Sequence, residues 1–376
     1  YDALSADVDA DCPCEPMGAE DPLFILYTSG STGGPKGVPL SHYGQLWALW
    51  KKLQSQPSPD ERYIIAQPLF HMNGLMSAKT VFCTNASVVL LPSFSTKSYI
   101  KAMADYKVTG ATAVPTMWAR VIKEDELIKS LDLSSFKKIV LGSAPMTVGL
   151  WDRIKDAFPG ITIGIGYGTT EAGPAIFGPH PKGIPAPPIS LGYPIVEDAV
   201  KIVDGPNENE GVLLMRNPSL MAHYHNLPQQ TAKAIRDGWY YSGDVVKRDE
   251  NGFYFFVGRA DDMFVCSGEN IYPGEVEKML ERHPLVQQAA VVPLADEERG
   301  QVPVAFIVAR PDAKLEASEI RTYSLSNGPA YQHPRRIAFV SDLRWAGTNK
   351  VARKALLEKA RQLEASHGWS PASVGA

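Results

Sequence analysis

Residues 27–37 (YTSGSTGGPKG) are rich in hydroxyl residues and glycines and contain a single lysine, Lys36. Glycines let backbone N–H groups approach phosphate oxygens, hydroxyls add hydrogen-bond donors, and the lysine adds a positive charge. The segment differs from the usual P-loop, because Pro35 precedes the lysine and Gly37 stands where a Ser or Thr would hold magnesium. We predict a polyphosphate-binding loop, and the alternative is a flexible surface loop of small residues.

The elements on either side of this loop are typical of an α/β fold. Residues 23–27 (LFILY) have the pattern of a buried strand that enters the loop directly, and Ser41 is a suitable N-cap for a helix. Predicted strands then alternate with helices, which favours a sheet with helices on its faces. The strands expected here are 63–66, 87–91, 110–114 and 138–141, with helices from Lys97 and Met117.

Two further regions follow along the chain. Residues 200–257 contain short predicted strands separated by turns, which indicates a strand-rich subdomain. Past Gly258 the pattern changes to a helix that starts at Pro273, followed by strands and helices in alternation. We predict a large N-terminal α/β sheet-and-helix region with a β-rich subdomain up to residue 258, and a separate small α/β domain over 263–376.

Residues 27–37 resemble the phosphate-binding signature of the adenylate-forming superfamily, which groups acyl-CoA and aryl-CoA ligases, peptide-synthetase adenylation domains and luciferases. Further motifs follow in the order typical of that family. Gly142-Ser143-Ala144-Pro145 resembles the segment along the adenine, and Tyr167-Gly168-Thr169-Thr170-Glu171 resembles the loop around the adenine and the α-phosphate. The resemblance implies that Thr170 contacts the α-phosphate and that Glu171 holds Mg²⁺, a role that suits a carboxylate oxygen.

Tyr241-Ser242-Gly243-Asp244 resembles the segment whose aspartate accepts the ribose hydroxyls, and residues 258–263 resemble the junction between two domains. The resemblance implies that Arg259 reaches the ribose and that Asp261 is the hinge. It also implies an incomplete N-terminal adenylation core over 1–258, a hinge over 259–262 and a small mobile C-terminal domain over 263–376. The residues that it assigns to ATP or AMP are Thr28, Ser29, Gly30, Ser31, Thr32, Gly33, Lys36, Gly142, Ser143, Ala144, Tyr167, Gly168, Thr169, Asp244 and Arg259.

Gly347-Thr348-Asn349-Lys350 resembles the C-terminal lysine motif of the family, although the residues before it lack the usual Pro-Arg-Thr. The resemblance implies that Lys350 is catalytic, and a mobile ammonium can stabilise negative charge when a carboxylate approaches a polyphosphate. Without that context Lys350 would pass for an ordinary surface lysine.

Residues 68–74 (PLFHMNG) match the form seen in acyl-CoA and aryl-CoA ligases, which implies that His71 lies by the substrate carboxylate. Amino-acid-activating relatives carry an aspartate near this point, and none is visible here. Ser267 and Gly268 resemble the loop that borders the tunnel for coenzyme A. The residues expected to line the acyl pocket are Met72, Ala113, Val114, Met117, Gly164 and Ile165.

Composition narrows the classes of partner. The chain has 37 Lys and Arg against 41 Asp and Glu, a formal net charge of −4, which gives no basic excess for nucleic acid. No apolar run approaches the roughly 20 residues of a membrane span. Four cysteines are too few for a disulfide framework and favour the cytoplasm, and we assign no metal to Cys12 and Cys14.

The function that we predict is ATP-dependent ligation of an aromatic or fatty acid to coenzyme A, through an acyl-adenylate, with ATP, Mg²⁺ and coenzyme A as co-substrates. Two alternatives stay open: an adenylating enzyme with another acceptor, such as a carrier-protein arm, and an inactive nucleotide-binding fragment. The family has a longer region before the phosphate loop, so we expect an N-terminally truncated piece that exposes apolar surface and self-associates.

Overall fold

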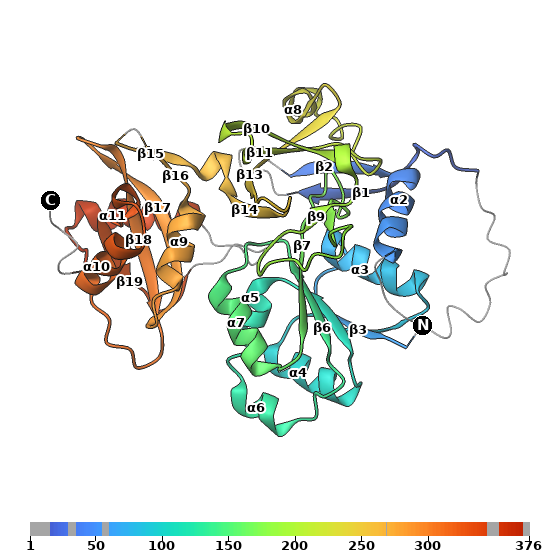
Figure 1. The fold of residues 1–376 in the computed structure, drawn as a ribbon, viewed down its shortest axis with the longest axis horizontal. Coiled ribbons are helices and arrows are strands. Elements are labelled where there is room, and N and C mark those ends of the chain that lie inside the picture. The colour runs from blue at the N-terminus through green and yellow to red at the C-terminus, as the bar shows by residue number, and fades with distance from the viewer. Residues whose placement is uncertain (1–15, 29–34, 55–59, 268, 344–352, 371–376) are drawn as a thin grey trace.

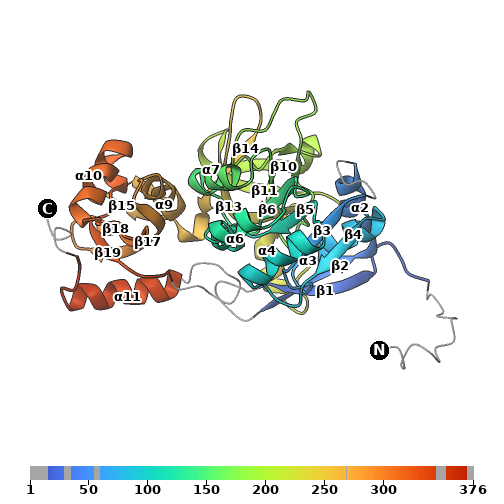
Figure 2. The ribbon, with the colours of Figure 1, turned by 90° about the horizontal axis from the view of Figure 1, so that it is seen from below.

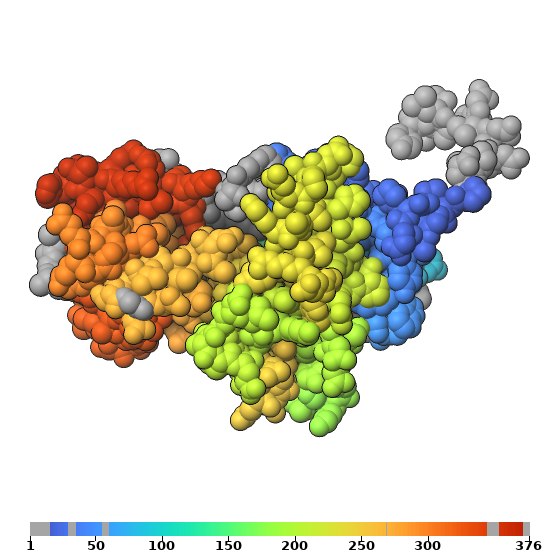
Figure 3. Space-filling model, turned by 90° about the horizontal axis from the view of Figure 1, so that it is seen from above, coloured from blue at the N-terminus to red at the C-terminus, as the bar shows by residue number. Residues whose placement is uncertain are grey.

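The computed structural model describes residues 16–28, 35–54, 60–267, 269–343 and 353–370. Two units lie end to end along the long axis, as Figure 1 shows in ribbon form and Figure 3 as a surface. The larger unit holds the N-terminal elements and the smaller unit holds the elements drawn in orange and red. No described helix is long and apolar enough to cross a membrane.

A five-stranded parallel sheet is the centre of the larger unit. Its strand order is β4-β3-β5-β6-β7, and every neighbouring pair is parallel. The strands are β3 Arg62–Ile65, β4 Ser87–Leu90, β5 Gly110–Ala113, β6 Lys138–Gly142 and β7 Thr162–Gly166. The helices that alternate with them are α3 Met72–Cys83, α4 Thr96–Asp105, α5 Pro115–Val121, α6 Asp125–Ser130 and α7 Val148–Ala157.

One hydrophobic core joins the sheet to α4, α5 and α7. It contains fully buried Ile64 and Leu141 from the strands and Tyr99, Trp118 and Ile154 from the helices. Helix α3 contacts β3, β4 and β5 but contributes nothing to this cluster. Because side chains alternate across a sheet, α3 covers the other face.

The segment that flanks the predicted phosphate loop is a hairpin. Strand β1 (Pro22–Thr28) pairs antiparallel with β2 (Lys36–Ser41), and Thr28 lies opposite Lys36 at the base of the loop. Helix α2 (His42–Leu53) follows at once. The Ser41 hydroxyl accepts a hydrogen bond from the Gly44 amide at 3.1 Å, so the predicted N-cap is confirmed.

The strand-rich region is an antiparallel sheet ordered β10-β11-β13-β12, with β14 on the free side of β13. Strand β13 is its longest member and pairs with β11, β12 and β14. The elements here are β8 Phe177–Gly178, β9 Tyr193–Pro194, η1 Glu197–Ala199, β10 Val200–Asn207, β11 Glu210–Met215, α8 Pro228–Ala234, β12 Ile235–Arg236, β13 Trp239–Arg248 and β14 Tyr254–Arg259.

The smaller unit is a sheet ordered β16-β15-β18-β17, with β19 parallel to β18, packed with helices. Its hydrophobic core takes all its buried members from residues 264–369. The elements are η2 Ala260–Asp262, β15 Phe264–Cys266, β16 Glu269–Ile271, α9 Pro273–Glu281, β17 Val286–Asp296, β18 Gly300–Ala309, α10 Ala317–Asn327, η3 Ala330–Gln332, β19 Arg336–Phe339 and α11 Arg353–Ala365.

The predicted fold class is confirmed in its main features. A parallel α/β sheet, a strand-rich region and a small α/β unit follow one another in the order expected. Helices α5, α8 and α9 each begin with a proline, whose fixed φ suits a first helical position. The exact domain bounds of 258 and 263 stay a prediction.

Candidate active site

Two of the predicted motifs follow neighbouring parallel strands. Gly142 ends β6, and Tyr167 follows Gly166 at the end of β7. A Cβ on Gly142 would lie 2.5 Å from the Gly166 carbonyl oxygen, so only glycine allows this close approach. Ser143 then takes a positive φ of 65°. The carboxyl ends of parallel strands are where open α/β sheets bind ligands, so both motifs lie at the favoured edge.

A chain of hydrogen bonds joins Lys36, Tyr224 and Glu171. The Lys36 ammonium donates to the Tyr224 hydroxyl at 3.2 Å, and this hydroxyl donates to Oε1 of Glu171 at 2.8 Å. Glu171 is buried, and the Lys36 Nζ also lies 4.4 Å from the centre of the Tyr224 ring. The structure therefore brings the predicted phosphate-binding lysine and the predicted magnesium ligand to the two sides of one tyrosine.

A second chain joins Tyr167, Asp244 and Arg259. The Tyr167 hydroxyl donates to Oδ2 of Asp244 at 2.6 Å, and Nη1 of Arg259 lies 2.8 Å from Oδ1. Arg259 also donates to the Ser242 carbonyl at 2.7 Å and reaches Asp261 at 3.2 Å. Asp244 and Arg259 lie directly opposite each other on β13 and β14, so strand pairing fixes the contact.

The tyrosines of this region remain protonated. Burial, followed by nearby carboxylates, raises the pKa of Tyr167 and of Tyr240 well above the ordinary value. Burial and Glu171 likewise raise the pKa of Tyr224. Burial alone would lower the pKa of Arg259, but Asp244 and Asp261 raise it further than burial lowers it. The site thus holds neutral hydroxyl donors and a fixed cation.

The loop after β7 is shaped by its own glycines. A Cβ on Gly168 would lie 2.5 Å from the Cα of Pro174, and Gly173 takes a φ of 78°. The Thr169 hydroxyl accepts from the amide of Ala172, which follows Glu171. Half-buried Thr170 lies inside this turn. The turn therefore fixes where the Glu171 backbone enters the site.

Helix α3 begins beside the β6 motif. His71 is its N-cap residue and is exposed, with its ring 4.7 Å from that of Phe70. The Asn73 amide donates to the Ser143 hydroxyl at 3.4 Å, which joins the start of α3 to the residue after β6. The structure thus places the predicted carboxylate-side histidine at the same edge of the sheet as Gly142 and Ser143.

The residues predicted for the acyl pocket divide between two clusters. Met72 and Ile165 pack, partly buried, against the cluster that Tyr167 also contacts. Met117 is almost fully buried in the core between sheet and helices, with Ala113 beside it in the same cluster and Val114 packed against it. Gly164 lies on β7, one residue before Ile165. Their contact with a substrate stays a prediction.

Several predicted residues lie outside the described part of the chain. They are Cys12, Cys14, Ser29, Gly30, Ser31, Thr32, Gly33, Gly268 and Lys350. Ser267 is described: it is exposed, takes a φ of 52°, and its amide donates to the Arg299 carbonyl.

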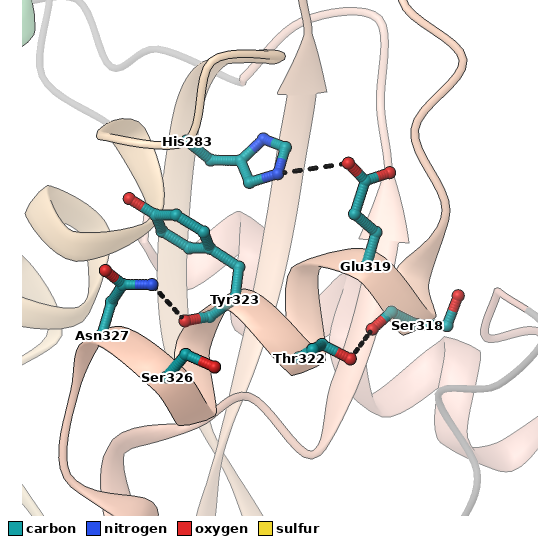
Figure 4. A pocket seen from close by; sticks show the side chains of 7 residues that line it. All are labelled: His283, Ser318, Glu319, Thr322, Tyr323, Ser326 and Asn327. Carbon is teal, nitrogen blue, oxygen red and sulfur yellow. Dashed lines mark hydrogen bonds and ion pairs between the residues drawn. The ribbon is translucent and has the colours of Figure 1, made fainter.

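A shallow hollow of about 490 Å³ opens elsewhere, in the smaller unit (Figure 4). It runs along α10, and Nε2 of His283 lies 3.4 Å from Oε1 of Glu319. The His283 Nδ1 accepts from the Leu285 amide, so Nε2 is the nitrogen that can donate. None of the residues predicted for ATP or acid binding lines this hollow, and we keep the candidate site at the sheet edge.

Comparison with known proteins gives the family. The sequence profile of the AMP-binding enzymes matches residues 2–225, and that of the AMP-binding enzyme C-terminal domain matches residues 275–350. This chain belongs to the AMP-binding enzyme family. The first profile includes Lys36, Glu171 and Tyr224, and the second ends at Lys350.

Named relatives of this AMP-binding enzyme are CoA ligases. A feruloyl-CoA synthase of Amycolatopsis sp. is 31% identical over 350 residues, covering 91% of this chain and 71% of the relative. A long-chain-fatty-acid–CoA ligase of Bacillus subtilis is also 31% identical, over 354 residues, covering 90% of this chain and 62% of the relative. The predicted membership of the acyl-CoA and aryl-CoA synthetase branch is confirmed.

A solved structure gives the same fold. The crystal structure of the anthranilate CoA ligase AuaEII in complex with anthranoyl-AMP superimposes with a TM-score of 0.81 at 29% identity. The match covers 93% of this chain and 69% of that chain. The large N-terminal and small C-terminal arrangement is therefore that of adenylate-forming enzymes.

Tyr224 and Tyr240 were missed by the sequence analysis. Tyr224 contacts residues far away in the sequence, and Tyr240 lies near enough to Glu171 and Asp244 for both carboxylates to raise its pKa. The sequence pointed to Tyr240 only through its position two residues before Ser242, next to the predicted ribose-binding motif, and it gave no indication of Tyr224.

Proposed function

We propose that this AMP-binding enzyme is an ATP-dependent carboxylate–CoA ligase. The observation that carries the proposal is the pair of hydrogen-bonded chains, Lys36–Tyr224–Glu171 and Tyr167–Asp244–Arg259. The first offers a cation and a carboxylate for phosphate and its metal ion. The second offers carboxylate oxygens and a guanidinium for a nucleoside.

Glu171 fits a magnesium ion that arrives with ATP. Mg²⁺ usually takes one or two protein carboxylates, with phosphates and water completing its octahedral coordination. Within the described residues no group of three His, Cys, Asp or Glu is arranged for a metal. Glu171 is the carboxylate that we propose for the ion. When bound, the ion would neutralise charge on the phosphates. Tyr224 orients Glu171 for that contact, and Lys36 adds a second positive charge.

The first half-reaction activates the acid. A carboxylate oxygen attacks the α-phosphorus of ATP, the bond to the bridging oxygen breaks, and pyrophosphate leaves with that electron pair. In this proposal Thr170 would contact the α-phosphate, Asp244 and Arg259 would hold the ribose, and Lys350 would offset the repulsion between the two anions. Ser143, Ala144 and Tyr167 would border the adenine.

The second half-reaction transfers the acyl group. The sulfur of coenzyme A attacks the carbonyl carbon of the acyl-adenylate, the C–O bond to phosphate breaks, and AMP leaves with the electron pair. Ser267 and Gly268 would border the tunnel for coenzyme A. Rotation of the smaller unit at Asp261 would exchange Lys350 for this face between the two steps.

The acid is aromatic or aliphatic. The feruloyl-CoA synthase and the long-chain-fatty-acid–CoA ligase have the same sequence identity to this chain, 31%. The residues that we propose for the pocket are small or apolar, which suits a ring or a hydrocarbon chain alike: Met72, Val114, Met117, Gly164 and Ile165. His71 at the start of α3 would lie by the carboxylate.

Carboxylate-dependent ATP–pyrophosphate exchange tests the proposal over a panel of aromatic and aliphatic acids. We expect exchange with at least one acid, a loss of about 10²–10³-fold in Lys350→Ala, and thioester once coenzyme A is added. Exchange without thioester would favour another acceptor, such as a carrier-protein arm. No exchange with any acid would favour an inactive nucleotide-binding protein.

We also propose that the protein self-associates and works in the cytoplasm. Tyr43, Leu46 and Trp50 form an apolar stripe on α2, exposed by 49%, 63% and 54%, and Phe82 on α3 is exposed by 78%. Strand β4 is an edge of the parallel sheet with Leu90 exposed. Sedimentation velocity should show a concentration-dependent dimer or larger species, and a monomer at all concentrations would contradict this.

A further inference from the structure

The chain between β11 and α8 lies against the loop that carries Glu171. We call residues 217–225 the strap, and its buried members are Ser219, Met221 and Tyr224. The Met221 amide donates to the Glu171 carbonyl at 2.7 Å, and the Tyr224 hydroxyl donates to Oε1 of the same glutamate at 2.8 Å. The strap thus holds both the backbone and the carboxylate of Glu171.

Asn217 is the first residue of the strap and anchors it to the same loop. Its side-chain amide donates to the Ala172 carbonyl at 3.0 Å, and its Oδ1 accepts from the Ser219 amide at 2.7 Å. A carbonyl on one side and an N–H on the other allow only one orientation of the Asn217 amide. Ala172 is fully buried and directly follows Glu171, so loss of the amide would take a donor from a buried carbonyl.

The strap is also packed closely where it turns. A Cβ on Gly173 would lie 2.6 Å from the Cβ of Ser219, and a Cβ on Gly44 would lie 2.7 Å from the Pro218 carbonyl oxygen. The Ser219 hydroxyl donates to the Gly44 carbonyl, in the first turn of α2, at 2.6 Å. Several contacts therefore hold the strap, so loss of one hydrogen bond should shift it locally and leave the protein folded.

The far end of the strap contacts the hairpin that carries Lys36. The His225 amide donates to the Gly37 carbonyl at 2.8 Å. Pairing of β2 with β1 also holds Lys36, so the lysine has support that does not come from the strap. Glu171 lies in a loop, and the hydrogen bonds described for its carbonyl and its carboxylate both come from the strap. A shift of the strap near Asn217 should therefore move Glu171 more than Lys36.

We propose that Asn217 is a positioning residue that sets the Glu171 carboxylate for a magnesium ion bound with ATP. The inference rests on the proposed function and deepens it. Asn217 acts through the Ala172 carbonyl on the neighbouring glutamate, and not through contact with the nucleotide. Its loss should weaken the part of nucleotide binding that depends on the metal ion and spare the part that does not.

Calorimetric titration of the full chain with α,β-methylene-ATP, in Mg²⁺ or in EDTA, separates these two parts. Mg²⁺ should tighten binding to the unaltered protein. Asn217→Ala should bind about 10-fold more weakly in Mg²⁺, the usual effect of one lost hydrogen bond, and within about twofold of the unaltered protein in EDTA. Asn217→Asp keeps the acceptor for the Ser219 amide and loses the donor to Ala172, so in Mg²⁺ it should bind at least as weakly as Asn217→Ala.

The matched control is Asn327→Ala at the end of α10, where a side-chain amide likewise donates to a backbone carbonyl, that of Tyr323, at 2.9 Å. Its binding should be unchanged in both conditions. Equal weakening of Asn217→Ala in Mg²⁺ and in EDTA would indicate general damage and overturn the proposal, as would unchanged binding in Mg²⁺ or a lack of any Mg²⁺ effect on the unaltered protein. These results would leave nucleotide binding intact, whereas an unaltered protein that binds no nucleotide would overturn the proposed function as well.

Discussion

Tyr224 is the residue that joins Lys36 to Glu171 in the candidate site. Its hydroxyl accepts from Lys36 and donates to Glu171, so one oxygen sets the distance between a cation and a carboxylate. The tyrosine can do this only while protonated, and burial with the nearby Glu171 charge raises its pKa far above neutrality. The Tyr224 hydroxyl thus keeps its proton across the physiological pH range.

Tyr224→Phe should weaken adenylation without unfolding the protein. Loss of a hydrogen bond to a charged group costs about 1.5–3 kcal/mol, so exchange should fall about 10–100-fold and half-saturation by Mg²⁺ should move to higher concentration. Steady-state exchange over a magnesium series is the measurement. Tyr106→Phe, at an exposed tyrosine after α4, is the control. An unchanged magnesium dependence would contradict the bridging role.

At this scale the sequence predicted the residues but not their contacts. Resemblance named Lys36, Glu171, Asp244 and Arg259, and the structure brings them together in two pairs. Their roles toward ATP stay predictions. The bridging Tyr224 left no signal, because its partners lie 188 and 53 residues away and spacing along a chain does not report such contacts.

Strands β6 and β7 lie close together where they end, at Gly142 and Gly166. The approach depends on Gly142, where a Cβ would meet the backbone oxygen of Gly166 at 2.5 Å. A backbone oxygen in a ladder cannot turn aside as a flexible side chain can. The segment predicted to lie along the adenine therefore starts from a strand end that tolerates no side chain.

Gly142→Ala should destabilise the protein by about 1–3 kcal/mol, the usual cost of overpacking, and weaken AMP binding. Gly164→Ala on β7 is the matched control for stability, since its Cβ would meet no atom nearer than 3.7 Å. Denaturant unfolding with and without AMP measures both effects. If the two variants unfold at the same denaturant concentration, the strands can move apart without loss of stability and the prediction is wrong.

Most elements were predictable because their signals are local. The strands expected at 63–66, 87–91, 110–114 and 138–141 appear within a residue or two of those bounds, and the helix expected from Pro273 begins there. Helix α3 was not expected. Its first turns contain Asn73, Gly74 and Ser77, which are poor helix formers, and the helix is held by packing, with Gly74 directly against the Pro68 carbonyl.

The two units of the molecule meet where α9 ends. Glu281, its last residue, is close enough to Thr147 and Arg153 of the larger unit for both to affect its pKa, and Gly149 of α7 lies against its carbonyl. Lys278 donates to the Phe256 carbonyl on β14 at 2.7 Å. Figures 1 and 2 both show α7 beside α9.

Burial raises the pKa of Glu281 to about 7, although the Ala289 amide, Thr147 and Arg153 lower it and Glu277 raises it. A raised carboxyl pKa stabilises the fold fully below the unfolded value near 4.5, and this contribution is lost as the pH rises through about 7. Above pH 7, Glu281→Gln should therefore be more stable than the unaltered protein, by about 2 kcal/mol after allowance for partial exposure. Unfolding followed from pH 4.5 to 8 measures this.

The control for that measurement is Glu358→Gln on the exposed face of α11, where no change with pH is expected. A stability curve for Glu281→Gln parallel to that of the unaltered protein would contradict the assignment. The contact between the two units could not be predicted from the sequence. Helices α7 and α9 are far apart along the chain, and neither carries a recognisable motif.

The smaller unit builds its hydrophobic core from its own residues. All the buried members of that core come from residues 264–369, and its described links to the rest run through η2, α9 and neighbouring loops. The smaller unit could therefore be exchanged between related proteins as one piece. A smaller unit taken from a relative would have to fit only the junction at η2 and the contact between α9 and α7. The residues proposed for the acyl pocket all belong to the larger unit and would not change.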